Sequence, residues 1–269
     1  MAIDFDPELT RWKKSPRNVW GFSRRLGSPI VTAIRKVQHR SSAQHSSHHA
    51  SSRSTSVSLS EGGKLNTAHN LKEQGWAYFP EFFSSDTHRI LLDEWPRLSL
   101  FSPPRLDLAK SYDTLPFGWS HRRRLVSPDV SPFVYSVFDL LFSEETARLV
   151  TNLVGDGVPR VGANVGLSWA RHHHYLLPHR DSNSEGDGSW VNFIIFVDGK
   201  DEPLSSGGTS IFRTSRYDEV IFSPLSLRNT AICYDTRGSF YHGFPPVRWG
   251  GFSKRIICNF ASENELALE

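Results

Sequence analysis

The chain has 269 residues, of which 38% are hydrophobic and 12% aromatic, so it can bury one sizeable core of roughly 200 residues with a segment left over. Its formal net charge of +3 is unevenly distributed: residues 1–60 carry 10 basic and 3 acidic side chains, whereas residues 61–269 carry 21 and 25. An acidic globular part argues against nucleic acid as a partner, because a nucleic-acid enzyme usually places its positive field around its cleft. No run of about 18 apolar residues is present, so we expect no transmembrane segment.

The first 65 residues are predicted to form a basic, Ser- and His-rich tail that is largely disordered. Ten of the residues 41–60 are serine, and such a segment buries too little apolar surface to offset the entropy lost on ordering. Residues 18–37 mix apolar with basic side chains, which makes them a candidate for peripheral contact with an anionic membrane surface. Gly27 and Pro29 interrupt a helix there, so a flexible arm is the alternative.

Two features bear on the cellular compartment. The N-terminus carries Asp4, Asp6 and Glu8 and no apolar stretch directly after them, unlike a secretory signal peptide. Cys233 and Cys258 lie inside apolar runs, where buried free thiols are expected rather than a disulfide framework. We therefore expect a cytoplasmic protein, with the inner face of a membrane as the place where the tail could dock.

A globular domain is predicted over residues 66–265, and its first half contains the helices. The expected elements in chain order are a strand at 75–80, a helix from Ser84 or Ser85 to Trp95, a long loop at 98–131, and helices at 132–142 and 144–154. The loop is rich in Pro, Ser and Arg. It is interpreted as a functional lid or, alternatively, as a solvated run of charge.

The second half of the domain is predicted to consist of strands. Short apolar runs separated by Asp-Gly, Gly-Gly and Arg-Gly turns predict strands at residues 165–175, 191–197, 209–212, 219–222, 231–234, 240–242 and 254–260. No helix is expected between them, which favours an antiparallel sandwich or barrel over βαβ units.

The motif His179-Arg180-Asp181 holds two potential metal ligands. Because alternate side chains of a strand point to the same face, His179 and Asp181 would project side by side. His242 lies on a later strand that a rolled sheet can bring back beside the first. Two imidazoles and one carboxylate leave coordination positions open, which suits non-haem Fe(II).

In the order of its motifs the chain resembles the Fe(II)/2-oxoglutarate-dependent dioxygenases, most nearly the branch of the prolyl hydroxylases and phytanoyl-CoA hydroxylase. The resemblance covers residues 75–261, and its features are a helical first half, His179-x-Asp181 at a strand end, the apolar strand 193–197, Gly207-Gly208-Thr209, His242-Gly243 and a basic residue on the last strand. It implies a mainly β domain with flanking helices, folded as a double-stranded β-helix or jelly roll.

The resemblance also implies cofactors and a reaction. Fe(II) would be held by His179, Asp181 and His242, with 2-oxoglutarate and O₂ as co-substrates and ascorbate as an optional reductant. The implied reaction is hydroxylation of an unactivated C–H bond with release of succinate and CO₂. Related halogenases lack the carboxylate ligand, so Asp181 favours hydroxylation or another oxidation.

In that family a basic residue after the second histidine pairs with the distal carboxylate of 2-oxoglutarate, and Arg248, Lys254 and Arg255 are the candidates here. Strand alternation places Arg255 on the same face as Asn259 and places Lys254 on an apolar face. Arg255 is therefore our prediction, because a guanidinium can bind a carboxylate through two hydrogen bonds. A surface arginine on an edge strand is the alternative.

Further contacts are predicted around this site. Asn259 and Tyr175 are expected to touch the co-substrate, and the expected substrate contacts are Arg171, His173, Trp119, Arg122, Arg123 and Arg124. Trp169 and Asn192 are candidates for the pocket wall, with core packing as the alternative. Of the run His172-His173-His174, only His173 is expected to face inward.

The substrate class follows only in outline. A lid that carries three arginines favours an anionic small molecule, glycan or lipid head group, while an amino-acid side chain stays open. Two alternatives for the function remain, namely a cupin-type metal enzyme that does not use 2-oxoglutarate, and a non-catalytic jelly-roll binding module with a docking tail.

Overall fold

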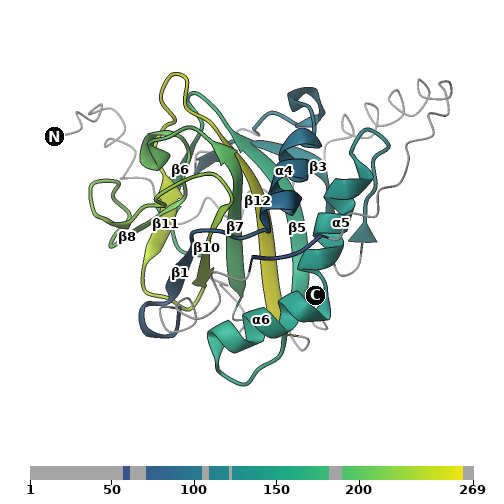
Figure 1. Cartoon of the computed structure of the whole chain (residues 1–269). Helices are drawn as coiled ribbons and strands as arrows, with labels where there is room; N and C mark the ends of the chain where they lie inside the picture. Colours follow the sequence, from purple (N-terminus) through teal and green to yellow (C-terminus); the bar gives the residue numbers. More distant parts are fainter. Residues whose placement is uncertain (1–56, 61–70, 105–108, 121–122, 182–189, 263–269) are drawn as a thin grey trace, which may run out of the picture. The chain divides into compact units, whose positions relative to one another are not determined.

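Figure 1 shows the computed structural model of the chain, in which residues 57–60, 71–104, 109–120, 123–181 and 190–262 are described. The chain divides into two units, Met1–Arg53 and Ser54–Glu269. The first unit, which includes the predicted membrane-contact segment, lies outside the described residues. The architecture below belongs to the second unit.

Two antiparallel sheets form a jelly roll. From edge to edge, the larger sheet consists of β1 (Trp76–Phe79), β10 (Thr230–Asp235), β7 (Val191–Gly199), β12 (Ser253–Ser262), β5 (Arg160–Ala170), β3 (Asp113–Ser120) and β4 (Arg123–Arg124). The smaller sheet consists of β2 (Lys110–Ser111), β6 (Tyr175–His179), β11 (Tyr241–Phe244), β8 (Ser210–Phe212) and β9 (Val220–Phe222). From β5 onward the chain passes back and forth between the two sheets, so residues far apart in sequence meet in the space between them.

Three helices cover the outer face of the larger sheet (Figure 1): α4 (Ser85–Asp93), α5 (Pro132–Leu141) and α6 (Glu144–Val154). Each helix begins after a serine whose side chain accepts a hydrogen bond from a backbone N–H of the first turn: Ser84, Ser131 and Ser143. Gly155 ends α6 with φ +68°, a left-handed conformation that favours glycine. Short 3₁₀ turns complete the described helices at η3 (Leu98–Leu100) and η4 (Pro203–Ser205).

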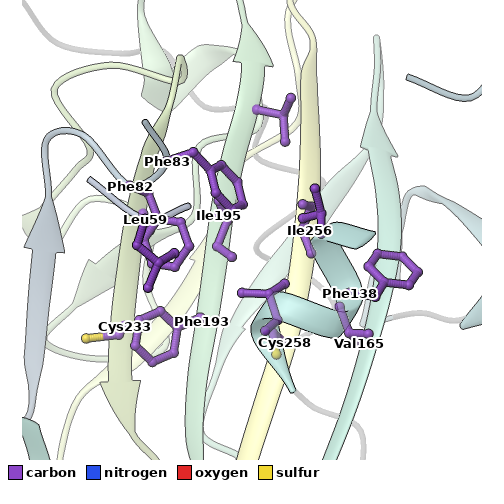
Figure 2. Close-up of a cluster of buried hydrophobic side chains, with 14 of the residues drawn as sticks. Leu59, Phe82, Phe83, Phe138, Val165, Phe193, Ile195, Cys233, Ile256 and Cys258 are labelled. Carbon is purple, nitrogen blue, oxygen red and sulfur yellow. The ribbon is translucent and has the colours of Figure 1, made fainter. Parts of the chain in front are cut away.

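The main core lies between these helices and the larger sheet. In Figure 2, Phe138 of α5 packs near Val165 of β5, while Phe193 and Ile256 project from β7 and β12 toward the same layer. Cys233 and Cys258 are buried free thiols, as the sequence predicts.

A second, smaller cluster fills part of the space between the two sheets. Its members come from both sheets and include Ile194, Phe196, Ile232 and Ile211, with Ile257 packed against them. Strand β7 therefore buries apolar side chains on both of its faces, which explains its uninterrupted apolar sequence.

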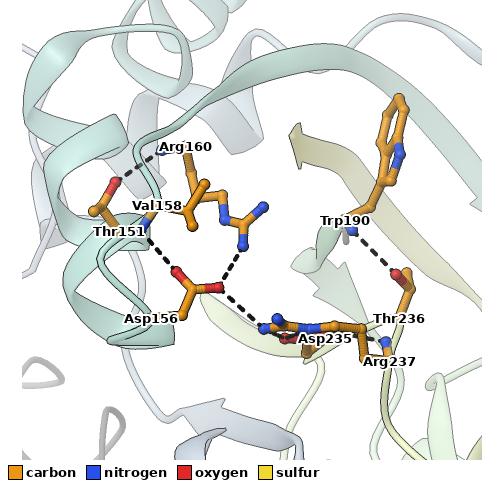
Figure 3. A network of polar contacts seen from close by, with 8 residues as sticks. All are labelled: Thr151, Asp156, Val158, Arg160, Trp190, Asp235, Thr236 and Arg237. Carbon is orange, nitrogen blue, oxygen red and sulfur yellow. Dashed lines mark hydrogen bonds and ion pairs between the residues drawn. The ribbon is translucent and has the colours of Figure 1, made fainter. Parts of the chain in front are cut away.

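An ion-pair network joins the turn after α6 to the end of β10 (Figure 3). Asp156 Oδ2 accepts from the buried Arg160 over 2.7 Å and lies 3.3 Å from Arg237 Nη2, and Arg237 also pairs with Asp235. Burial opposes ionisation of Asp156, but the backbone N–H of Val158 and the charges of Arg160 and Arg237 outweigh burial and lower its pKa. The network links the start of β5 to the end of β10, across the edge of the sheet on which β7 and β12 lie between them.

The predicted helices are confirmed, and so are most of the predicted strands, but three details differ. The loop expected at residues 98–131 contains β2, β3 and β4, because β2 pairs with β6 while β3 pairs with β5 and with β4, which extends both sheets at their edges. The strand expected at residues 165–175 is split into β5 and β6 by a turn. The packed part of the chain includes residues 57–60, ahead of the expected start at 66, because Leu59 pairs with Phe83 and is buried.

None of the helices in the described part of the chain combines the length and the apolar character needed to cross a bilayer.

Candidate metal centre

The three predicted ligands come together between the sheets. His179 ends β6 and lies directly opposite His242 of β11 in the antiparallel register, and Asp181 follows β6 by two residues. One ligand atom from each residue lies within 4.8 Å of the others. His179 Nε2 is 3.3 Å from Asp181 Oδ1, and His242 Nε2 is 3.6 Å from Asp181 Oδ2.

The tautomer of His179 suits a metal ligand. Its Nδ1 lies 2.8 Å from the carbonyl oxygen of Leu177, and because a carbonyl can only accept, Nδ1 carries the proton. Nε2 is then the ring nitrogen left to bind a metal, and without a metal it faces Asp181 Oδ1 as a hydrogen-bond partner at 3.3 Å. Burial alone would lower the pKa of His179, but its hydrogen bonds to Asp181 and to the Leu177 carbonyl together raise it.

The other two ligands have the charge states that a metal requires. Burial opposes ionisation of Asp181, but hydrogen bonding from His179 and the charges of both histidines outweigh burial and lower its pKa to about 2. Burial lowers the pKa of His242 to about 4, so its imidazole is neutral near pH 7. A carboxylate and two imidazoles with open coordination positions match the donor set of non-haem Fe(II).

The Asp181 carboxylate is supported from the larger sheet. Asn192 Nδ2 of β7 donates to Asp181 Oδ2 over 2.7 Å, and the Tyr234 hydroxyl of β10 donates to the same oxygen over 3.2 Å. Asn192 Oδ1 in turn accepts a hydrogen bond from Asn259 of β12. Tyr234 is completely enclosed, and burial raises its pKa well above 10, so it is a neutral phenol.

Arg255 lies on the inner face of β12 and is 1% exposed. Its guanidinium carbon is 4.7 Å from the ring centroids of both Tyr112 and Phe244. Its Nε and Nη2 atoms are buried and have no hydrogen-bond partner among the described residues, and the same holds for the Oγ of Ser168, the residue opposite Arg255 in register on β5. Burial lowers the pKa of Arg255 to about 10, so the side chain is charged at neutral pH.

These unpaired buried donors fit a carboxylate of a bound diacid. A buried charged group without a partner costs several kcal/mol, so the arrangement is consistent with a ligand that completes it. Asn259, which reaches the Asp181 carboxylate through Asn192, lies four residues along β12 from Arg255, about 13 Å at the rise of a strand. The long arginine side chain and a five-carbon diacid can cover that distance together.

The two other basic candidates lie elsewhere. Arg248 is exposed in the turn between β11 and β12. Lys254 projects from the opposite face of β12, where its Nζ lies 3.4 Å from Asp198 and 5.3 Å from the Trp169 ring centroid. Trp169 packs against the main core, so its interpretation as a wall of the site was wrong and the core alternative holds.

The predicted position of Tyr175 is corrected by a β-bulge. Strand alternation places Tyr175 on the face of His179, but the register between β6 and β11 shifts between the pair His179–His242 and the pair Leu176–Phe244. Leu176 therefore shares the inner face with His179, and Tyr175 faces away. Tyr175 instead lies near Tyr217, a residue on the outer side of the smaller sheet.

The histidine run is also corrected. His172, His173 and His174 occupy the turn between β5 and β6, where strand alternation does not apply, and His173 has φ +69°. His173 is exposed, while His174 is buried. Arg171, in the same turn, donates to the buried Asp113 over 2.6 Å and keeps a half-exposed side chain.

The predicted lid residues are only partly described. Trp119 of β3 pairs with Arg124 of β4, and Ser120 pairs with both Arg123 and Asn164 of β5, so this hairpin extends the larger sheet beside Asn164. Arg122 lies outside the described residues. The contacts of these arginines with a substrate stay a prediction.

Sequence reasoning missed Tyr234, Tyr112, Ser168 and Phe244. Tyr234 shares its strand face with Ile232, but β10 is buried on both sides and offers no contrast of polarity that would single out the tyrosine. Tyr112 lies in the segment that the sequence presents as a loop. Only the pairing of distant strands brings Ser168 beside Arg255.

No protein-family model and no curated protein sequence matches the chain. Solved structures do match. An oxidoreductase of the 2OG-Fe(II) oxygenase family from Burkholderia pseudomallei has 15% identity and a TM-score of 0.54 over 76% of this chain and 93% of its own. A prolyl hydroxylase from Trichoplax adhaerens, solved with a peptide of hypoxia inducible factor, has 13% identity and a TM-score of 0.54 over 76% and 90%.

A third match is the non-haem α-ketoglutarate-dependent epimerase SnoN of nogalamycin biosynthesis, with 12% identity and a TM-score of 0.54 over 73% of this chain and 79% of its own. Identities this low establish a shared architecture and leave the reaction open. The chain therefore has the jelly-roll fold of the 2OG-Fe(II) oxygenases, the fold that its sequence motifs predicted.

Proposed function

We propose that this protein is an Fe(II)- and 2-oxoglutarate-dependent oxygenase that hydroxylates an unactivated C–H bond of its substrate. Fe(II) would be held by His179, Asp181 and His242, and Arg255 would hold the distal carboxylate of 2-oxoglutarate. The observation that carries the proposal is the buried, charged Arg255 with unpaired donors, in the same inter-sheet space as a two-histidine, one-carboxylate cluster.

The chain's own residues would mainly bind, orient and exclude water. Tyr112 and Phe244 enclose the Arg255 guanidinium, which keeps its planar donors in one orientation. The unpaired Ser168 hydroxyl would supply another hydrogen bond to the same carboxylate. When bound, iron together with 2-oxoglutarate and O₂ supplies the two-electron oxidation that yields succinate and CO₂.

The carboxylate ligand favours hydroxylation or a related oxidation over halogenation, since Asp181 would take the coordination position that a halide needs. The matched solved structures include a hydroxylase with a bound peptide and an epimerase. Hydroxylation and epimerisation both occur on this fold, so the fold does not distinguish between them. Hydroxylation is proposed because of Asp181 and because of the resemblance to the prolyl hydroxylase branch.

The substrate we propose is a small molecule, a glycan or lipid head group, or an amino-acid side chain, with an anionic group favoured by the arginines of the β3–β4 hairpin. The acidic balance of residues 61–269 argues against nucleic acid. Residues 18–37 would provide peripheral contact with the inner face of a membrane in a cytoplasmic protein.

Succinate formation tests the proposal. Protein incubated with Fe(II), ascorbate and 2-oxoglutarate is expected to release succinate slowly even without its substrate, and His242→Ala is expected to release none. Anaerobic addition of 2-oxoglutarate to the Fe(II) protein should also produce the visible charge-transfer band of an α-keto acid chelate.

The two alternatives give different results in the same experiment. A protein that takes up Fe(II) but neither binds nor consumes 2-oxoglutarate would be a cupin-type metal enzyme. A protein that takes up no iron would be a binding module. Either result would refute the proposed function.

A further inference from the structure

The two oxygens of Asp181 have different surroundings. Oδ1 faces His179 Nε2 at 3.3 Å. Oδ2 lies 3.6 Å from His242 Nε2 and also accepts hydrogen bonds from Asn192 Nδ2 over 2.7 Å and from the Tyr234 hydroxyl over 3.2 Å. Neither donor belongs to the ligand set, and both come from strands of the opposite sheet.

From this difference we propose that Asn192 and Tyr234 are positioning residues that keep Asp181 a one-oxygen ligand, with Oδ1 offered to iron and Oδ2 held back. The inference rests on the proposed function and deepens it. It assigns to two side chains outside the ligand triad the control of how many coordination positions stay open.

The number of open positions decides whether the proposed reaction can proceed. With two imidazoles and one carboxylate oxygen as ligands, an octahedral metal would keep three positions open, and a keto acid bound through two atoms would leave one of them for O₂. A carboxylate that bound through both oxygens would take that last position. Two hydrogen bonds to Oδ2 oppose such a change, because both would be lost or weakened when Oδ2 turned to the metal.

The orientation of the Asn192 amide is itself fixed. Asn259 lies opposite Asn192 in the register of β12 and β7 and donates to Asn192 Oδ1. Tyr234 lies opposite Asn192 on the other side, in the register of β10 and β7. With its oxygen engaged by Asn259, Asn192 presents its NH₂ group to Asp181.

The contact between Tyr234 and His242 also supports a hydrogen bond from Tyr234 to Asp181 Oδ2 in the iron-bound protein. The Tyr234 hydroxyl lies 3.0 Å from His242 Nε2 as well as 3.2 Å from Asp181 Oδ2. A metal held by His242 Nε2 would use the lone pair of that nitrogen and exclude a proton there, so His242 Nε2 could no longer hydrogen-bond to the phenol. Of these two partners, Asp181 Oδ2 would then be the acceptor left to the hydroxyl.

Nitric oxide, a stable substitute for O₂, tests the inference on the full-length protein. Asn192→Leu keeps the size of the side chain and removes its donor, and Tyr234→Phe removes only the hydroxyl. Each variant, loaded anaerobically with Fe(II), is titrated with nitric oxide with and without 2-oxoglutarate, and the paramagnetic iron–nitrosyl signal is measured. We expect the variants to bind nitric oxide at least tenfold more weakly than wild type when 2-oxoglutarate is present, and equally well when it is absent.

Asn164→Leu is the matched control, since Asn164 stands in the same register row on β5 and no described hydrogen bond joins it to Asp181. It should behave as wild type. Equal binding by wild type, Asn192→Leu and Tyr234→Phe in the presence of 2-oxoglutarate would overturn the inference alone. Failure of the wild-type protein to bind Fe(II) and 2-oxoglutarate would instead refute the proposed function, and the inference with it.

Discussion

Arg255 is the single residue on which co-substrate binding is expected to depend most. Its buried Nε and Nη2 have no hydrogen-bond partner in the part of the chain that the structure describes, and removing one member of a buried, hydrogen-bonded charge pair costs about 2 kcal/mol or more. We therefore expect Arg255→Gln to raise the dissociation constant of 2-oxoglutarate by about 30-fold or more, measured by anaerobic titration of the Fe(II) protein. Lys254→Gln, one position away on the other face of β12, should leave that constant unchanged, and an equal loss in both variants would contradict the assignment.

His242 gives the metal-free protein a defined dependence on pH. Burial lowers its pKa from 6.5 to about 4, so the folded protein keeps a neutral imidazole where the unfolded chain already binds a proton. Above about pH 6.5 the residue is neutral in both states and does not reduce the free energy of unfolding. As the pH falls from 6.5 toward 4, protonation of the unfolded chain lowers that free energy by roughly 3 kcal/mol.

Urea denaturation of the metal-free protein at several pH values measures this effect. The free energy of unfolding of wild type minus that of His242→Gln should fall by roughly 3 kcal/mol between pH 7 and pH 4. Asp181, with its pKa at about 2 instead of 3.8, loses its contribution only at lower pH, so the two windows separate. A difference that stays constant down to pH 4 would show that His242 is not held neutral by burial.

At the scale of single strands, two glycines beside the site are expected to respond in opposite ways to an added methyl group. A Cβ on Gly243 of β11 would lie 2.5 Å from the Leu176 carbonyl oxygen and 3.0 Å from the Pro178 nitrogen, both backbone atoms of β6. A Cβ on Gly166 of β5 would meet no described atom within 4 Å. The first glycine permits the bulged pairing that brings His179 to His242, whereas the second borders open space.

Gly243→Ala should therefore lower the free energy of unfolding by about 1–3 kcal/mol and weaken Fe(II) binding, because the strands that carry both histidines must separate. Gly166→Ala should leave stability unchanged or raise it by up to about 1 kcal/mol, since alanine loses less backbone entropy than glycine on folding. Urea denaturation and anaerobic Fe(II) titration of both variants measure the contrast. Equal stability of the two variants would show that the close approach at Gly243 relaxes without cost.

For the molecule as a whole, the distribution of charge suggests that membrane contact and 2-oxoglutarate turnover belong to different parts of the chain. The positive charge is concentrated in residues 1–60, while residues 61–269 are acidic in balance. Deletion of residues 1–53, which stops short of the buried Leu59, is expected to leave 2-oxoglutarate turnover intact and to abolish co-sedimentation with vesicles of anionic lipid. Vesicle binding that persists in the shortened protein would assign the membrane contact elsewhere, and binding that is unaffected by salt would argue against an electrostatic origin.

Much of the site could be predicted from sequence because the relevant rules are local. Alternation along β12 separates Arg255 from Lys254, and the same rule places His179 and Asp181 together when they lie at a strand end. Helix starts at Ser84, Ser131 and Ser143 follow from side-chain capping, which involves only neighbouring residues. The order of the motifs was then sufficient for the fold class.

Alternation fails where the backbone is irregular, and sequence alone does not locate those places. The turn at residues 171–174 and the bulge before His179 each break the period of two, which removed His173 and Tyr175 from the predicted inner face. The turn is hydrogen-bonded to Val247, and the bulge lies in the pairing of β6 with β11. Both irregularities depend on contacts between segments more than 60 residues apart in the sequence, so the local sequence pattern does not predict them.

By itself the sequence determined the jelly-roll class, the three candidate ligands and the face of Arg255, because each depends on spacing within one strand or on the order of motifs. Only the tertiary structure decided that Asn192 and Tyr234 hold one oxygen of Asp181, and that Tyr112, Phe244 and Ser168 surround Arg255. These contacts join different strands of both sheets. They arise when the rolled sheets close on each other and buried polar atoms must find partners in whichever strand lies opposite.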